Sequence, residues 1–135
     1  MKQEEILQYN KMCAEFLGWE IVENEILTVP DDCKVKPQIY FPAYQNLLFH
    51  SDWNWIMEVV EAIEKLKLPS PSIIPIRVQI EEKSCRIFKG TWNDSKEGFI
   101  SVVSYKGNKV QYSKKEAVIN AINQFLIWYE QNKII

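Results

Sequence analysis

The side chains best suited to chemistry in this sequence stand together at residues 49–55, in the order FHSDWNW. His50 is the only histidine, and it lies two positions before Asp52. A histidine close to a carboxylate can work as a general base or supply two metal ligands. Ser51 stands between them, but adjacent residues at a helix start point in different directions, which disfavours a serine nucleophile activated by His50.

The same stretch also has a purely structural interpretation. Ser51 can cap a helix that starts here, Asp52 favours the positive end of the helix dipole, and Trp53 and Trp55 can pack. His50 would then only stabilise the turn. In a third interpretation, the free backbone amides of the helix start bind an anion or small ligand, which His50 and the two tryptophans also contact.

A second candidate contact is Trp92, in a segment (residues 91–97, TWNDSKE) expected to join two strands as a hairpin loop. A tryptophan at a loop tip can anchor a protein partner, or it can fold back over the edge of the core. The sequence therefore offers candidates for ligand or partner binding and none for catalysis or metal binding. These candidates are His50, Ser51, Asp52, Trp53, Trp55 and Trp92.

Composition and motifs disfavour several classes of function. Sixteen basic and eighteen acidic side chains give a net charge of −2. With the signs interspersed along the chain, no basic patch for a nucleic-acid backbone is expected. The four glycines form no phosphate-binding loop, so no nucleotide cofactor is predicted. The three cysteines include no C-x-x-C pair, which disfavours a zinc site or a disulfide framework and favours a reducing compartment.

No membrane or export segment is expected. Apolar runs such as residues 125–129 stop after five residues, whereas a bilayer-spanning helix needs about 20. The first eight residues place acids where a signal peptide needs positive charge. We therefore expect a cytoplasmic protein.

Three helices are predicted to position these residues. The first covers residues 4–17, with Gly18 as its stop. The second starts at Ser51, carries an apolar stripe and must end before Pro69. The third begins with a capping box, Ser113 and Glu116. This last helix is apolar around so much of its circumference that it needs two surfaces to cover it, either the sheet and another helix or the sheet and a second copy of the chain.

The remaining segments predict a small sheet. Alternating residues at 74–80 indicate a half-buried strand, which residues 81–83 turn back into strands at 85–89 and 98–105, with a fourth short strand at 110–112. Short connections favour an antiparallel meander. Residues 19–44 are mostly irregular, with short strand-like pieces at 19–22 and 26–29. The predicted fold is α+β, a single domain over residues 1–135 with three helices packed on a small antiparallel meander sheet of three to four strands.

Three stretches together resemble a known family. Residues 10–18, 48–64 and 113–129 are similar in pattern to small uncharacterised phage and prophage proteins of Bacteroidetes-type bacteria, over about half of the chain. The resemblance implies a phage-associated bacterial origin. It implies no activity or site, because that family has none assigned. Its members often read Ser-Ser-Trp-Asp-Trp where this chain has SDWNW at residues 51–55, which argues against a fixed partnership of Asp52 with His50.

Three functions are consistent with these patterns, in the following order. The first is a non-enzymatic binding or regulatory protein that contacts a protein partner or forms a homodimer, because the chain is rich in aromatic residues and lacks catalytic motifs. The second is a protein that binds a small ligand or anion at the start of the second helix. The third is a small hydrolase that uses His50 with a carboxylate.

Overall fold

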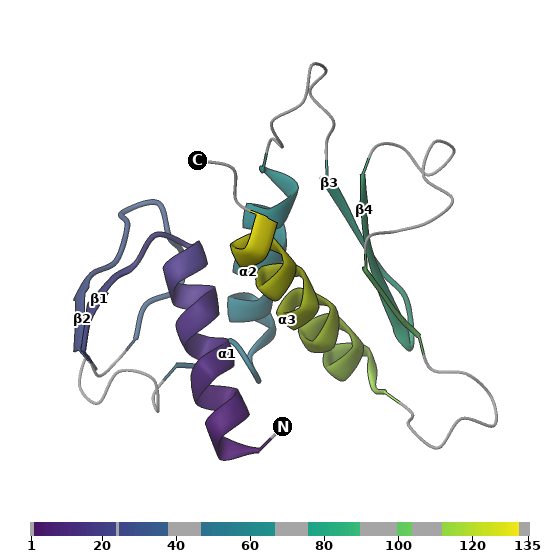
Figure 1. Ribbon diagram of the computed structural model, residues 1–135, viewed down its shortest axis with the longest axis horizontal. Helices are drawn as coiled ribbons and strands as arrows, with labels where there is room; N and C mark the ends of the chain where they lie inside the picture. The colour runs from purple at the N-terminus through teal and green to yellow at the C-terminus, as the bar shows by residue number, and fades with distance from the viewer. Residues whose placement is uncertain are drawn as a thin grey trace. The chain divides into compact units, whose positions relative to one another are not determined.

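The computed structural model describes residues 2–23, 25–37, 47–66, 76–89, 100–103 and 112–132. In this part of the chain three helices and five strands follow one another in the order α-β-β-α-β-β-β-α (Figure 1). The contacts divide the chain into two compact units, Met1–Val59 and Val60–Ile135. A single domain over the whole chain stays a prediction.

The first helix, α1, covers Gln3–Phe16 and ends as the sequence predicted. Gly18 has a φ of +87°, the left-handed region that a residue with a Cβ enters only at a cost. Its N–H donates to the carbonyl of Glu15, and the N–H of Trp19 reaches back to the carbonyl of Ala14, each at 3.0 Å. These two bonds form a Schellman motif, which satisfies carbonyl groups at the helix end and directs the chain into the next element.

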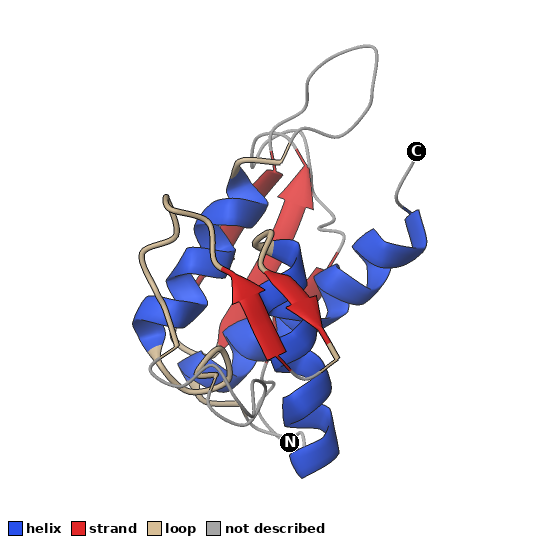
Figure 2. Cartoon of the chain, turned by 90° about the vertical axis from the view of Figure 1, so that its left-hand side faces the viewer, coloured by secondary structure: helices blue, strands red, loops and turns tan. Residues whose placement is uncertain are grey.

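Strands β1, Glu20–Val22, and β2, Glu25–Thr28, pair as an antiparallel hairpin (Figure 2). Both lie where the sequence predicted short strand-like pieces. Only two residues connect them, and Glu23, the first, has a φ of +57°. Positive φ at the turn is what a two-residue hairpin with right-handed twist requires. Ile26 is buried on one face of the hairpin, whereas the other face of the hairpin is exposed.

The second helix, α2, covers Trp53–Glu64. Its buried side chains recur at helical spacing and match the apolar stripe of the sequence; they are Trp55, Ile56, Val59, Val60 and Ile63. The helix carries three glutamates and no basic residue.

In Val60–Ile135, strands β3, Ile76–Ile80, β4, Ser84–Lys89, and β5, Ile100–Val103, pair in sequence order as an antiparallel sheet. The turn between β3 and β4 is closed by the N–H of Glu81 donating to the carbonyl of Ser84 at 2.9 Å. Val78 opposes Ile87 across the ladder, and residues directly opposite share a face. Ile87, with Cys85 two positions before it, is fully buried.

The third helix, α3, covers Lys114–Asn132 and contacts β4 and β5. Its predicted capping box is present. The Glu116 N–H donates to Ser113 Oγ and the Ser113 N–H donates to Glu116 Oε1, both at 3.1 Å. The backbone N–H of Ser113, which donates to the carboxylate, is the main cause that lowers the pKa of the Glu116 carboxyl. Most of the wide apolar surface is buried, from Ala117 to Leu126, and Ile127 is its exposed member.

The α+β class and the three helices are thus confirmed. The expectation of one sheet is not matched, because the described strands form two sheets, β1-β2 and β3-β4-β5. Pro30 and the two aspartates that follow it end the first hairpin, and α2 intervenes before the second sheet begins. Of the expected fourth strand at 110–112, the first two residues lie outside the described part. No helix in the described residues is long and apolar enough to span a membrane.

Candidate functional site

Three aromatic rings form the interior beside the start of α2. Phe49 lies 5.5 Å from Trp19 and 4.8 Å from Trp55, measured between ring centroids, and the two tryptophans are 5.8 Å apart. The contacts of Trp55 with both neighbours are edge-to-face, the geometry that aromatic quadrupoles favour. Trp55 is therefore a core residue, as the structural interpretation of the sequence predicted, and is not available as a ligand platform.

Asn10 of α1, which is fully buried, contacts the turn before α2 and stabilises it. Its Nδ2 donates to the carbonyl oxygen of Leu47 at 3.2 Å and lies 3.3 Å from Nδ1 of His50. This contact was not predicted from the sequence, because thirty-seven or more positions separate the partners. A buried asparagine on the apolar side of a helix was the signal that could have been noticed.

The Asn10 contact determines the proton position on His50. The Leu47 carbonyl can only accept a hydrogen bond, so the amide group that faces it must be the NH₂. The same nitrogen faces Nδ1 of His50, which must therefore accept, and the ring proton resides on Nε2. Partial burial lowers the pKa of His50 from its ordinary value of 6.5, so the neutral ring is favoured.

Asp52, and not Ser51, caps α2. Its Oδ1 accepts the backbone N–H of Asn54 at 2.8 Å, and its carbonyl accepts the N–H of Ile56 at 2.9 Å. The predicted cap, Ser51, is exposed, and its own N–H donates to the carbonyl of Leu48 at 3.1 Å. The helix therefore begins one residue later than the sequence pattern indicated, since a carboxylate is as good a cap as a hydroxyl.

This capping arrangement disfavours two of the sequence hypotheses. Asp52 places a negative charge at the amides where an anion would bind. His50 Nδ1 accepts from Asn10, so this nitrogen cannot donate to the Asp52 carboxylate in a hydrogen-bonded dyad. The chemistry left to His50 is a hydrogen bond from Nε2–H.

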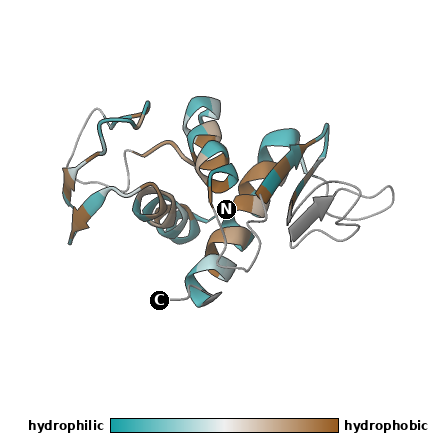
Figure 3. Ribbon diagram, turned by 90° about the horizontal axis from the view of Figure 1, so that it is seen from above, coloured by the Kyte–Doolittle hydropathy of each residue, from teal (hydrophilic) through white to brown (hydrophobic). Residues whose placement is uncertain are grey.

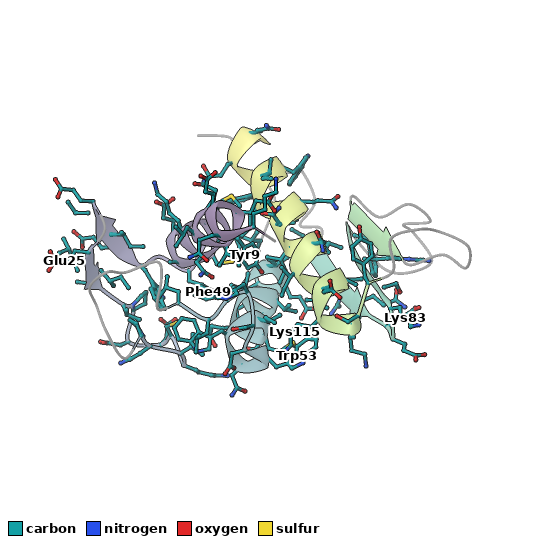
Figure 4. All side chains as sticks on the ribbon, turned by 90° about the horizontal axis from the view of Figure 1, so that it is seen from below. Tyr9, Glu25, Phe49, Trp53, Lys83 and Lys115 are labelled. Atoms are coloured by element: carbon teal, nitrogen blue, oxygen red, sulfur yellow. The ribbon has the colours of Figure 1, made fainter. Side chains whose placement is uncertain are left out.

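Two large apolar side chains are among the exposed residues at the α2 start. Trp53 is 36% exposed and Met57, one turn later on the same side of the helix, is 37% exposed. Figure 4 shows Trp53 projecting from α2 away from the labelled core residues Tyr9 and Phe49. Trp53 is thus the one tryptophan candidate of this segment that a partner could reach. Trp92 lies outside the described residues.

The described residues contain no group of three or more His, Cys, Asp or Glu side chains placed to hold a metal ion. The three cysteines, Cys13, Cys33 and Cys85, are free and buried. Burial raises the pKa of each thiol, that of Cys85 to about 12, so the reactive thiolate is scarce at neutral pH. They are packing residues.

The distribution of charge differs from the interspersed pattern expected from the sequence. Met1–Val59 holds ten acidic and four basic side chains, a net charge of −6, whereas Val60–Ile135 holds eight and twelve, a net charge of +4. Between Lys11 and Lys34 the chain has six acidic residues and no basic one. Counting charge by segment, in place of counting over the whole chain, would have revealed this asymmetry.

Comparison of the chain with protein-family models, with curated proteins and with solved structures found no match.

Proposed function

We propose that this chain is a small binding protein that contacts a protein partner through the exposed side of the first two turns of α2. The observation that carries the proposal is the pair Trp53 and Met57, each more than a third exposed and adjacent on one face of a capped helix. We call this pair the Trp53–Met57 face.

The chemistry of the pair favours a protein as its partner. Tryptophan is enriched among the few residues that carry most of the binding energy of interfaces. Methionine is unbranched and adapts its shape to an apolar surface. The helix beneath them is held by the Asp52 cap and by the buried Trp55, so little ordering of the backbone is needed on binding.

The other hypotheses have less support. The Asp52 carboxylate opposes an anion at the helix start, and His50 and Asp52 are engaged by other groups. The breadth of the apolar surface on α3 does not require a second copy, because most of that surface is buried within the chain. The likeness to small phage proteins would place this binder on a mobile element, which stays a prediction.

The test uses a variant with both Trp53→Ser and Met57→Ser, and Ile127→Ser as a matched control. Ile127 is 44% exposed on α3, so its replacement removes an exposed apolar side chain elsewhere. The partner is captured from cells that express the protein, purified, and titrated against each variant by calorimetry. We expect the double variant to bind at least about tenfold more weakly, a loss of about 1.4 kcal/mol, and the control to bind like the parent chain.

Equal affinities of the parent chain and the folded double variant would contradict the proposal. An equal loss of affinity in the Ile127→Ser control would also contradict it, because it would indicate non-specific hydrophobic association. A dimer of the parent chain in light scattering that the double variant fails to form would identify the partner as a second copy.

A further inference from the structure

The β1-β2 hairpin presents an apolar surface that the sequence candidates did not include. Val22 is 52% exposed and Leu27 is 48% exposed, more than any other large apolar side chain described. Val22 is opposite Glu25 in the ladder, and residues opposite each other share a face. The register shifts between Glu20 and Ile21, which leaves Leu27 as an extra residue in β2. Leu27 follows Glu25 by two positions, so its side chain lies on the same outer side.

The inner and outer sides of the hairpin differ as those of a half-buried sheet do. Ile26 is buried on the inner side, opposite the half-buried Ile21. The solvent side of an antiparallel sheet commonly carries polar residues at alternate positions, and here two of its positions carry Val22 and Leu27. Figure 3 shows apolar segments beside hydrophilic ones on both strands. We call the outer side of β1-β2, with Val22 and Leu27 at its centre, the hairpin face.

Five acidic residues belong to this hairpin or follow it closely in the chain. Glu20, Glu23 and Glu25 belong to the hairpin, Asp31 and Asp32 follow it, and all five are exposed. Figure 4 shows Glu25 pointing outward from the ribbon. Within the described residues, neither strand pairs with a third one. Like charges on one small ribbon repel each other, and a positively charged occupant would relieve that repulsion.

We propose that the hairpin face binds an extended, basic segment of a protein partner, one that alternates Lys or Arg with apolar residues. Apolar side chains of that segment contact Val22 and Leu27, and its cations lie against the carboxylates of the hairpin. An extended backbone fits because the hairpin is itself extended, so the side chains of the segment repeat at nearly the spacing of the strand residues that they contact. This surface uses residues different from those of the Trp53–Met57 face, so either proposal can fail while the other holds.

The test is a titration of the isotopically labelled full chain, followed by backbone amide NMR, with a short peptide that alternates Lys and Val. Two control peptides replace the Lys residues by Glu or the Val residues by Ser. One variant, Val22→Thr with Leu27→Thr, removes the exposed apolar side chains. The other, Glu20→Gln with Glu23→Gln and Glu25→Gln, removes the negative charges of the hairpin. Threonine keeps the strand propensity, so the hairpin should persist.

We expect the Lys-Val peptide to shift the amides of β1 and β2, and each variant to weaken its binding at least about tenfold. The Lys-Ser peptide should bind more weakly and the Glu-Val peptide not at all. A W53S variant should bind the Lys-Val peptide like the parent chain, which separates this test from that of the Trp53–Met57 face.

Three results would overturn the proposal. The first is no binding of the Lys-Val peptide, or binding that shifts amides elsewhere. The second is equal binding of the Lys-Ser peptide, which would reduce the effect to charge alone. The third is self-association of the chain that the Val22 and Leu27 changes abolish, which would make the occupant a second copy.

Discussion

At the residue scale, one buried side chain, Asn10, organises the segment that looked most like a reactive site. Its Nδ2 donates to the Leu47 carbonyl and lies against His50 Nδ1, which leaves the ring proton on Nε2, while partial burial lowers the pKa of His50 and favours the neutral ring. The residues before α2 that looked reactive in the sequence therefore form a turn, and the buried Asn10 stabilises it. The turn that they form leads directly into α2, the helix that carries Trp53.

The state of His50 predicts how stability depends on pH. Its folded pKa is lowered, so its contribution is fully present above about 6.5, its ordinary pKa, and is lost as the pH falls toward the folded value. His50→Asn keeps an acceptor near Asn10 but does not titrate. We expect the free energy of unfolding of the parent chain to fall more steeply than that of this variant between pH 7.5 and pH 5, as measured by urea denaturation. Parallel curves would contradict the assigned state of His50.

The two polar residues before α2 give an opposing pair of predictions. Asp52→Ala removes the observed cap and should cost about 0.5–2 kcal/mol of unfolding free energy. Ser51→Ala removes an exposed side chain and should change it by less than about 0.5 kcal/mol. Chemical denaturation of both variants measures the difference. A larger loss at Ser51 would restore the cap that the sequence pattern indicated.

At the element scale, the end of α1 depends on the backbone conformation of Gly18. A Cβ at this position would lie 3.6 Å from Pro30 Cγ, an ordinary contact, so space is available. The obstacle is the φ of +87°. Gly18→Ala should therefore destabilise the chain by about 1–2 kcal/mol through backbone conformation alone. Thermal unfolding checks this value, with Glu15→Ala as an exposed control in the same helix end; similar melting temperatures for Gly18→Ala and the control would contradict it.

Elements whose signals are local were predictable from the sequence. The Gly18 stop and the Ser113–Glu116 capping box involve neighbouring residues, and both occur as expected. The alternating strands β3 and β4 also follow from a local period. What the sequence could not provide is pairing over long separations, such as Asn10 with the turn at residues 47–50, because no local pattern encodes it.

At the scale of the whole molecule, the net charge of −2 conceals two units of opposite sign. Within the acidic unit Met1–Val59, the hairpin face carries the carboxylates of Glu20 and Glu25, whereas Trp53 and Met57 are uncharged, so the two proposed surfaces should respond differently to salt. Screening shortens the range of exposed charges from about 30 Å at 0.01 M to about 3 Å at 1 M ionic strength. Added salt should therefore weaken the Lys-Val peptide at the hairpin face markedly and leave binding through the Trp53–Met57 face nearly unchanged. Equal salt dependence in calorimetry would contradict this division.

The most direct measurement of the central claim is photo-crosslinking from the Trp53–Met57 face in living cells. A benzophenone amino acid replaces Met57 in one variant and the similarly exposed Ile127 in a control. We predict a discrete adduct to one protein partner from position 57 that position 127 does not give. No adduct from position 57, or the same adducts from both positions, would contradict the claim that this face binds a partner.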